Sequence, residues 1–148
     1  MTQLILIEKQ DGVMRIAFNR PQKKNAITFE MYDAIAAALK AASADPEVRV
    51  ALIHGSVDAF TAGNDLGDFL SKERPDPPPS LAVQEGLIAF DKPLVAAVGG
   101  VAVGIGTTML LHCDFVYCTA NTRFALPFVN LALVPEAASL FGSADLVL

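Results

Sequence analysis

The sequence predicts a single α/β domain built from repeated strand–strand–helix units. Three observations lead to this fold class. Strand-like and helix-like segments alternate along the chain, 53% of the residues are hydrophobic, and no linker or low-complexity segment divides the 148 residues. A chain of this length and composition can bury a substantial core as one domain. We therefore expect a layered sheet with helical crossovers rather than a β-sandwich.

The first part of the chain predicts a hairpin followed by a helix. Residues 4–8 and 13–18 have strand composition, and Asp11-Gly12 between them is a common turn pair. Residues 29–43 place apolar side chains on one helical face, and Thr28 can cap the N-terminus of that helix.

The rest of the chain alternates between apolar strands and short helices. The predicted elements are a strand at 48–53, a helix at 81–90, a strand at 93–98, a helix at 107–111 and a strand at 115–119. The strand at 48–53 lacks polar alternation after Arg49, so we expect it to be buried on both faces. The proline-rich stretch at 71–80 is predicted to be a loop.

Composition excludes several classes of function. A net charge of −5 argues against nucleic-acid binding, which requires clustered Lys and Arg. Cys113 and Cys118 have no metal-ligand spacing, so we expect no metal site and two reduced core thiols in a cytoplasmic protein. Residues 93–111 carry no charge, which makes a membrane helix the alternative there. Their four glycines favour a strand, a turn and a buried helix instead.

The segment FTAGNDL, at 60–66, raises the question of function. Gly-Asn-Asp clusters are ordinary turn chemistry, so a surface turn is one interpretation. Small residues also let a ligand approach backbone N–H groups, which can stabilise a forming oxyanion. The segment alone leaves both interpretations open.

Four motifs, in this order, resemble the crotonase family of enoyl-CoA hydratases and isomerases. They are NRPQKKNAI (19–27), FTAGNDL (60–66), DKPLVAAVGGVAVGIGT (91–107) and CDFVYCTANTRFALPFVNLALVPEAAS (113–139). The resemblance implies a crotonase-like spiral of strand–strand–helix units and an acyl-CoA substrate, with no separate cofactor because coenzyme A is part of the substrate. It also implies a homo-oligomer, either a trimer or a hexamer.

The resemblance also implies a set of site residues. The backbone N–H groups of Ala62 and Ile105 match the two oxyanion-hole donors of the family. The positions expected to contact the coenzyme A thioester are Lys23, Asn25, Ala26, Ala62, Gly63, Asn64, Asp65, Leu66 and Gly104. For Lys23 and its neighbour Lys24, a solvated loop is the equally weighted alternative.

The acidic residues that the motifs keep and lack favour isomerisation over hydration. The two glutamates of the family's hydratases match Thr108 and Phe128 here, and neither replacement is a general base. Glu136, in VPEAAS, resembles the single glutamate of the isomerases that convert 3-enoyl-CoA to 2-enoyl-CoA. One base and an oxyanion hole suffice for that proton transfer.

The end of the chain departs from the family pattern. The resemblance implies C-terminal helices that complete the acyl pocket and the oligomer, whereas this sequence ends with LFGSADLVL after Ser139. We therefore expect one crotonase-like core domain, 1–148, that lacks these helices. The alternatives to an isomerase are a non-catalytic acyl-CoA-binding or assembly subunit, or a hydratase with an altered acid/base set.

Overall fold

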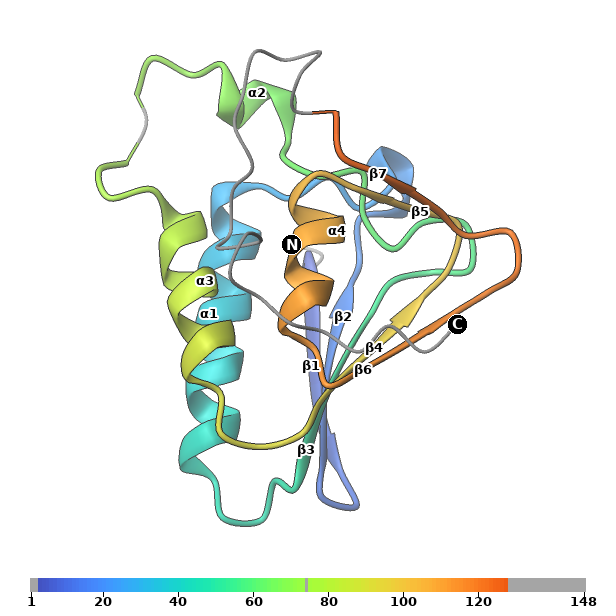
Figure 1. Ribbon diagram of the computed structural model, residues 1–148. Helices are drawn as coiled ribbons and strands as arrows, with labels where there is room; N and C mark the ends of the chain where they lie inside the picture. The colour runs from blue at the N-terminus through green and yellow to red at the C-terminus, as the bar shows by residue number, and fades with distance from the viewer. Residues whose placement is uncertain (1–2, 74, 128–148) are drawn as a thin grey trace.

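The computed structural model describes residues 3–73 and 75–127 (Figure 1). The strands are β1 (Ile5–Gln10), β2 (Val13–Phe18), β3 (Val50–His54), β4 (Leu94–Val98), β5 (Val101–Val103), β6 (Phe115–Cys118) and β7 (Arg123–Ala125). The helices are α1 (Phe29–Ala44), α2 (Leu66–Phe69), α3 (Pro79–Ala89) and α4 (Ile105–Thr108), with 3₁₀ turns at Pro21–Lys23 and Met109–His112. The predicted α/β fold class is confirmed.

Five strands form the main sheet, in the order β1-β2-β3-β4-β6. β1 pairs with β2 in an antiparallel hairpin, and the remaining neighbours are parallel. A smaller sheet pairs β5 with β7, and Thr61 forms an isolated parallel bridge to Ala102 of β5. The chain passes from the main sheet to the smaller sheet and then to a helix, which is the predicted strand–strand–helix order.

The helices cover one face of the main sheet. Figure 1 shows α1, α3 and α4 gathered on the same side of the strands, with α1 packed along α3. Alternate strand residues, such as Ile16 of β2 and Ile53 of β3, point into the core beneath Ile35 and Leu39 of α1. One core therefore lies between the sheet and the helical layer.

The strand around residue 50 corrects two expectations. β3 begins at Val50, and only Ala51 and Ile53 are buried, whereas Leu52 and His54 are partly exposed. The prediction of burial on both faces is therefore wrong, because the helices lie on one face only. For the same reason the prediction that Cys118 is a core thiol is wrong. Cys118 is exposed at the end of β6, while Cys113 is buried.

The hairpin and the first helix form where the sequence predicts them. Thr28 caps α1 by accepting a hydrogen bond from the Met31 N–H through its side chain. The short strands β5 and β7 were not predicted, because three residues are too few to show an apolar period. α3 begins at Pro79, inside the predicted loop, since proline is well accommodated at the first position of a helix.

The uncharged stretch at 93–111 is divided between several elements. It contains β4, β5, α4 and a 3₁₀ turn, as expected for a segment interrupted by glycines. None of the helices within the described residues combines the length and hydropathy that crossing a membrane requires.

Candidate active site

Residues 61–65 form a backbone ribbon between two other segments. On one side, the Thr61 N–H donates to the Val101 carbonyl (3.1 Å), and the Val103 N–H donates back to Thr61 (3.0 Å). On the other side, the Ile27 N–H donates to the Gly63 carbonyl (2.8 Å), and the Asp65 N–H donates to Ile27 (2.9 Å). The FTAGNDL segment is therefore held in place by its main chain.

Gly63 is required where this ribbon crosses β5. Its φ of +89° lies in the region that favours glycine, and an added Cβ would lie 2.8 Å from the Val103 carbonyl oxygen. Gly106 has a similar role, because a Cβ there would lie 2.4 Å from Cγ2 of Thr61. These close approaches bring the start of α4 directly against the 61–65 ribbon.

The Ala62 N–H is not available to a ligand. It donates to the Lys24 carbonyl at 2.9 Å. The prediction that Ala62 is an oxyanion donor is contradicted by this hydrogen bond. In this structure its N–H ties the ribbon to the 23–27 loop.

The Asn64 N–H has no acceptor within the described part of the chain. Ile27 and Asn64 form a parallel bridge in which Ile27 bonds the residues on either side of Asn64. In such a bridge the N–H of the central residue points away from its partner strand. The open donor of this segment is therefore two residues beyond the one predicted.

A second open N–H belongs to Ile105, as the sequence predicts. Gly104 precedes it with φ 56° and ψ −120°, a conformation that needs glycine, and the Gly104 N–H donates to the Ala125 carbonyl (2.8 Å). Within the described residues the Ile105 N–H has no acceptor. The α-helix that begins here spans only four residues, so the helix dipole contributes little and the individual N–H matters.

The Asp65 carboxylate is bound by other residues of the chain. Its carboxylate lies 2.6 Å from Nη1 of Arg20 and also accepts the Gly67 N–H at 2.8 Å, which caps α2. The Arg20 hydrogen bond, supported by these backbone donors, lowers the pKa of Asp65 and keeps it ionised. The Asp65 side chain thus has a structural role, and its expected contact with substrate stays a prediction.

Asn25 also has a structural role. Its side chain is fully buried, donates to the carbonyls of Ala59 (2.9 Å) and Phe60 (3.1 Å), and accepts the Arg20 N–H (2.9 Å). The prediction that Asn25 contacts substrate is contradicted for the side chain, which has no exposed surface. Ala26, beside it, is partly buried and gives its carbonyl to Arg20 (2.9 Å).

Lys23, Lys24 and Leu66 remain accessible. All three side chains are exposed, and neither lysine forms an ion pair with another described residue. They are accessible to a ligand, and the expectation that they contact substrate stays a prediction.

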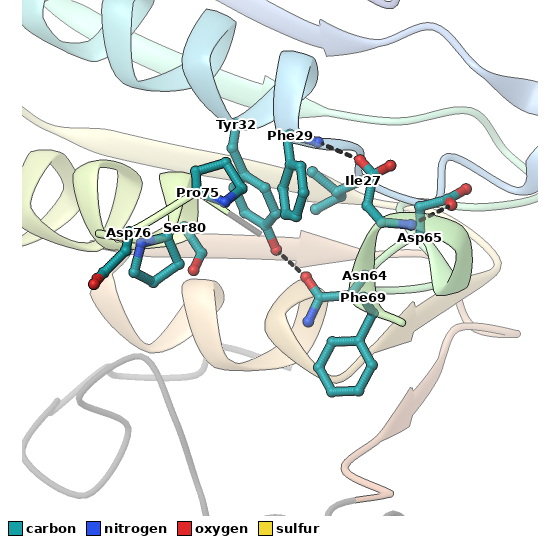
Figure 2. Close-up of a pocket in the computed structure, with 11 residues that line it drawn as sticks. Ile27, Phe29, Tyr32, Asn64, Asp65, Phe69, Pro75, Asp76 and Ser80 are labelled. Atoms are coloured by element: carbon teal, nitrogen blue, oxygen red, sulfur yellow. Dashed lines mark hydrogen bonds between the residues drawn. The ribbon is translucent and has the colours of Figure 1, made fainter. Parts of the chain in front are cut away.

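A cavity of about 320 Å³ opens beside Asn64, between α2 and the first turns of α1 and α3. Figure 2 shows aromatic side chains around it, from Phe29 and Tyr32 of α1 and Phe69 of α2. The Tyr32 hydroxyl donates to Oδ1 of Asn64 at 2.5 Å. The cavity can accept an apolar chain and has polar groups at one side.

Known proteins resemble this chain in sequence and in fold. The sequence pattern of the family described as enoyl-CoA hydratase/isomerase matches residues 8–143. The chain belongs to the enoyl-CoA hydratase/isomerase family. Enoyl-CoA delta isomerase 2 of Rattus norvegicus is 42% identical over 144 residues, which cover 93% of this chain and 37% of the rat protein.

Solved structures share the fold of this family member. Pseudomonas aeruginosa OdaA is 46% identical with a TM-score of 0.90, over 95% of this chain and 57% of OdaA. The enoyl-CoA hydratase/isomerase from Pseudoalteromonas atlantica T6c is 39% identical with the same TM-score of 0.90, over 95% of this chain and 56% of that protein. The predicted crotonase-like fold is confirmed. This chain spans just over half the length of these two proteins and 37% of the length of the rat protein.

The acid positions of this enoyl-CoA hydratase/isomerase family member lie partly within the described residues. Thr108 is fully buried, and its hydroxyl donates to the Ile105 carbonyl at 3.4 Å. Thr108 therefore offers no base toward the cavity. Phe128 and Glu136 lie outside the described residues, so the expectations for both stay predictions.

Sequence reasoning missed the contributions of two residues. Asn64 was predicted to contact substrate, but its role as the open donor depends on which neighbour each backbone group pairs with, and composition does not report that. Tyr32 was not singled out at all. Its signal was a hydroxyl beside the buried face of a helix, since a buried tyrosine usually places its O–H on a partner.

Proposed function

We propose that this chain carries the acyl-thioester site of an enoyl-CoA isomerase that moves a double bond from position 3 to position 2. Asn64 and Ile105 supply backbone N–H donors to the thioester oxygen, and Glu136 transfers the proton. The isomerase name of the rat relative is consistent with this proposal.

The observation that carries the proposal is a pair of N–H groups, on two adjoining segments, that have no acceptor among residues 3–73 and 75–127. The ribbon at 61–65 packs against β5 through Gly63 and against the start of α4 through Gly106, and the ribbon and α4 each contribute one donor. Preorganised donors stabilise the negative charge that forms on a thioester oxygen, and one such donor is typically worth about 3 kcal/mol in the transition state.

In the proposed reaction a single base, Glu136, carries out both proton transfers. Glu136 removes a proton from C2, and the electron pair conjugates through the double bond with the thioester to give a dienolate. The oxyanion is held by the N–H groups of Asn64 and Ile105. The same carboxyl returns the proton at C4, which leaves the double bond between C2 and C3.

The surroundings of the donors support an acyl-CoA substrate. The cavity beside Asn64 is lined by Phe29, Tyr32 and Phe69, which suits the apolar part of an acyl chain. Lys23 is exposed on the neighbouring loop, where its charge can meet a phosphate of coenzyme A.

The expected homo-oligomer, a trimer or a hexamer, and the cytoplasmic location belong to the same proposal. Support for an oligomer comes from the face of the main sheet opposite the helices. There Phe115 and Tyr117 of β6 are 47% and 63% exposed. Exposed aromatic side chains grouped on one face of a sheet fit a protein interface.

The test is the conversion of a 3-enoyl-CoA, followed by the ultraviolet absorbance of the conjugated product. Replacing Glu136 with Gln keeps the shape and removes the base, so turnover should fall by roughly 100-fold or more. Asp76→Asn is the matched control, because Asp76 is an exposed carboxylate that lines the cavity. Near-normal turnover by E136Q would overturn the assignment of the base.

Two further assays separate the alternatives. A 2-enoyl-CoA should gain little or no water, because Thr108 leaves no acid at the position matching one hydratase glutamate. A chain that binds acyl-CoA but converts neither substrate would be the non-catalytic subunit. Rapid hydration would instead indicate a hydratase with a different acid/base set.

A further inference from the structure

Asn64 combines an open donor with an acceptor on the same residue. Its N–H has no acceptor among the described residues, while its side chain ends in a carboxamide oxygen. Asparagine side chains readily accept hydrogen bonds from their own or neighbouring backbone N–H groups. An unrestrained Asn64 side chain would therefore compete with any ligand oxygen for that donor.

Tyr32 removes this competitor. Its hydroxyl donates to Oδ1 of Asn64 at 2.5 Å, and Figure 2 shows the ring reaching across the cavity wall toward the carboxamide. The residue is only 2% exposed and belongs to the core-facing side of α1, beside Met31 and Ile35. A hydroxyl on a packed ring is a fixed partner, so the carboxamide oxygen is held away from the main chain of Asn64.

We propose that Tyr32 is a positioning residue that keeps the Asn64 N–H open by binding the Asn64 carboxamide oxygen. The inference rests on the proposed function, in which that N–H holds the thioester oxygen. The chain needs such a device here because an alanine or glycine at position 64 would carry no competing acceptor, whereas asparagine does.

A simple tether between α1 and the ribbon makes a different prediction. If Tyr32 only anchored the ribbon, removing either end of the hydrogen bond would have the same effect. If Tyr32 sequesters an acceptor, removing its hydroxyl releases the competitor, and removing the competitor as well restores binding. The two roles are therefore separated by rescue.

The experiment titrates acetoacetyl-CoA into the full chain and follows the near-ultraviolet absorbance of its bound enolate. Four proteins are compared: the parent, Y32F, N64A and the Y32F/N64A double variant. Y32F should bind about tenfold more weakly, the worth of one lost hydrogen bond. Adding N64A to Y32F should recover most of that loss, and N64L should rescue in the same way because it also lacks an acceptor.

Controls keep the outcomes distinct. Phenylalanine preserves the Tyr32 ring and its packing, and melting temperatures verify that each variant folds. Tyr117→Phe is the matched control, since Tyr117 is the other tyrosine of the chain and lies exposed on β6. It should bind like the parent.

Two results would overturn the inference while leaving the proposed function standing. They are parent-like binding by Y32F, and equal weakening of Y32F, N64A and the double variant. A parent chain that does not bind acetoacetyl-CoA at all would overturn the proposed function, and the inference with it.

Discussion

The β1–β2 hairpin and the 61–65 ribbon both depend on backbone pairing, but to different ends. In the hairpin every residue of β1 faces a residue of β2, and side-chain alternation decides which face is buried. In the ribbon the N–H groups of Thr61, Ala62 and Asp65 are paired, while that of Asn64 has no acceptor in the part of the chain that the structure describes. The outward N–H groups of the edge strand β1 point to solvent, whereas the open N–H of the ribbon belongs to a residue that lines a cavity, and this placement is what suits Asn64 to binding.

The substitution with the largest expected effect removes the N–H of Asn64. Asn64→Pro deletes an N–H that has no partner within the described chain, whereas Asn64→Ala keeps it. Both variants lose the side chain, and because proline also fixes φ and restricts Gly63, the melting temperature of N64P must match that of N64A before their turnover is compared. Turnover of 3-enoyl-CoA by N64P should be about 10²–10³-fold below that of N64A. Equal turnover by the two variants would show that the Asn64 N–H takes no part in the reaction.

Loss of the Ala62 N–H, which is paired with the Lys24 carbonyl, should lower the stability of the fold more than loss of the Asn64 N–H does. Ala62→Pro breaks the hydrogen bond to the Lys24 carbonyl and should cost about 1–3 kcal/mol of stability. We expect the melting temperature to fall by roughly 3–10 °C, and by more than in N64P. Ala62→Ser, which keeps the N–H, is the control. A stable A62P chain with selectively lost turnover would return the donor role to Ala62.

The smallest expected effect concerns the ion pair that anchors the end of the ribbon. Because Arg20 lowers the pKa of Asp65, the pair stabilises the fold above the unfolded-state pKa of about 3.9. That contribution is lost as the pH falls through the lower folded-state pKa. Asp65→Asn keeps a capping side chain but removes the charge.

The measurement is the melting temperature between pH 3 and pH 7. D65N should melt roughly 3–8 °C below the parent at neutral pH, and the gap should close in acid. Asp33→Asn, at an exposed position on α1, should show no such convergence. A gap that is constant with pH would mean that the charge of Asp65 is not what stabilises the ribbon.

The sequence predicted the elements whose side chains repeat with a period. The hairpin, α1 with its Thr28 cap and the parallel strands all follow from alternation, helical spacing or capping chemistry. The strands β5 and β7 lack such a period because each has three residues. One-sided burial of β3 was also missed, since an apolar run does not tell whether one or both faces are covered.

The sequence predicts the correct segment for the first backbone donor but the wrong residue within it. Motif order places the donors in FTAGNDL and in GIGT (104–107), and each segment has an N–H without an acceptor among the described residues. The choice between Ala62 and Asn64 depends on pairing with Lys24 and Ile27, which lie far away along the chain. Asn25 was assigned to substrate for a similar reason: its motif lies beside the site, while its side chain is used to hold the Ala59 and Phe60 carbonyls.

The most direct test of the two-donor site is the vibrational spectrum of a bound thioester. An acyl-CoA with an isotope-labelled thioester carbonyl is added to the parent chain and to N64P, and the carbonyl stretch is read from the infrared difference spectrum. Two preorganised donors polarise the carbonyl, so its band should move to lower frequency in the parent than in water and move back part of the way in N64P. A bound carbonyl with the same frequency in water, in the parent and in N64P would contradict the account.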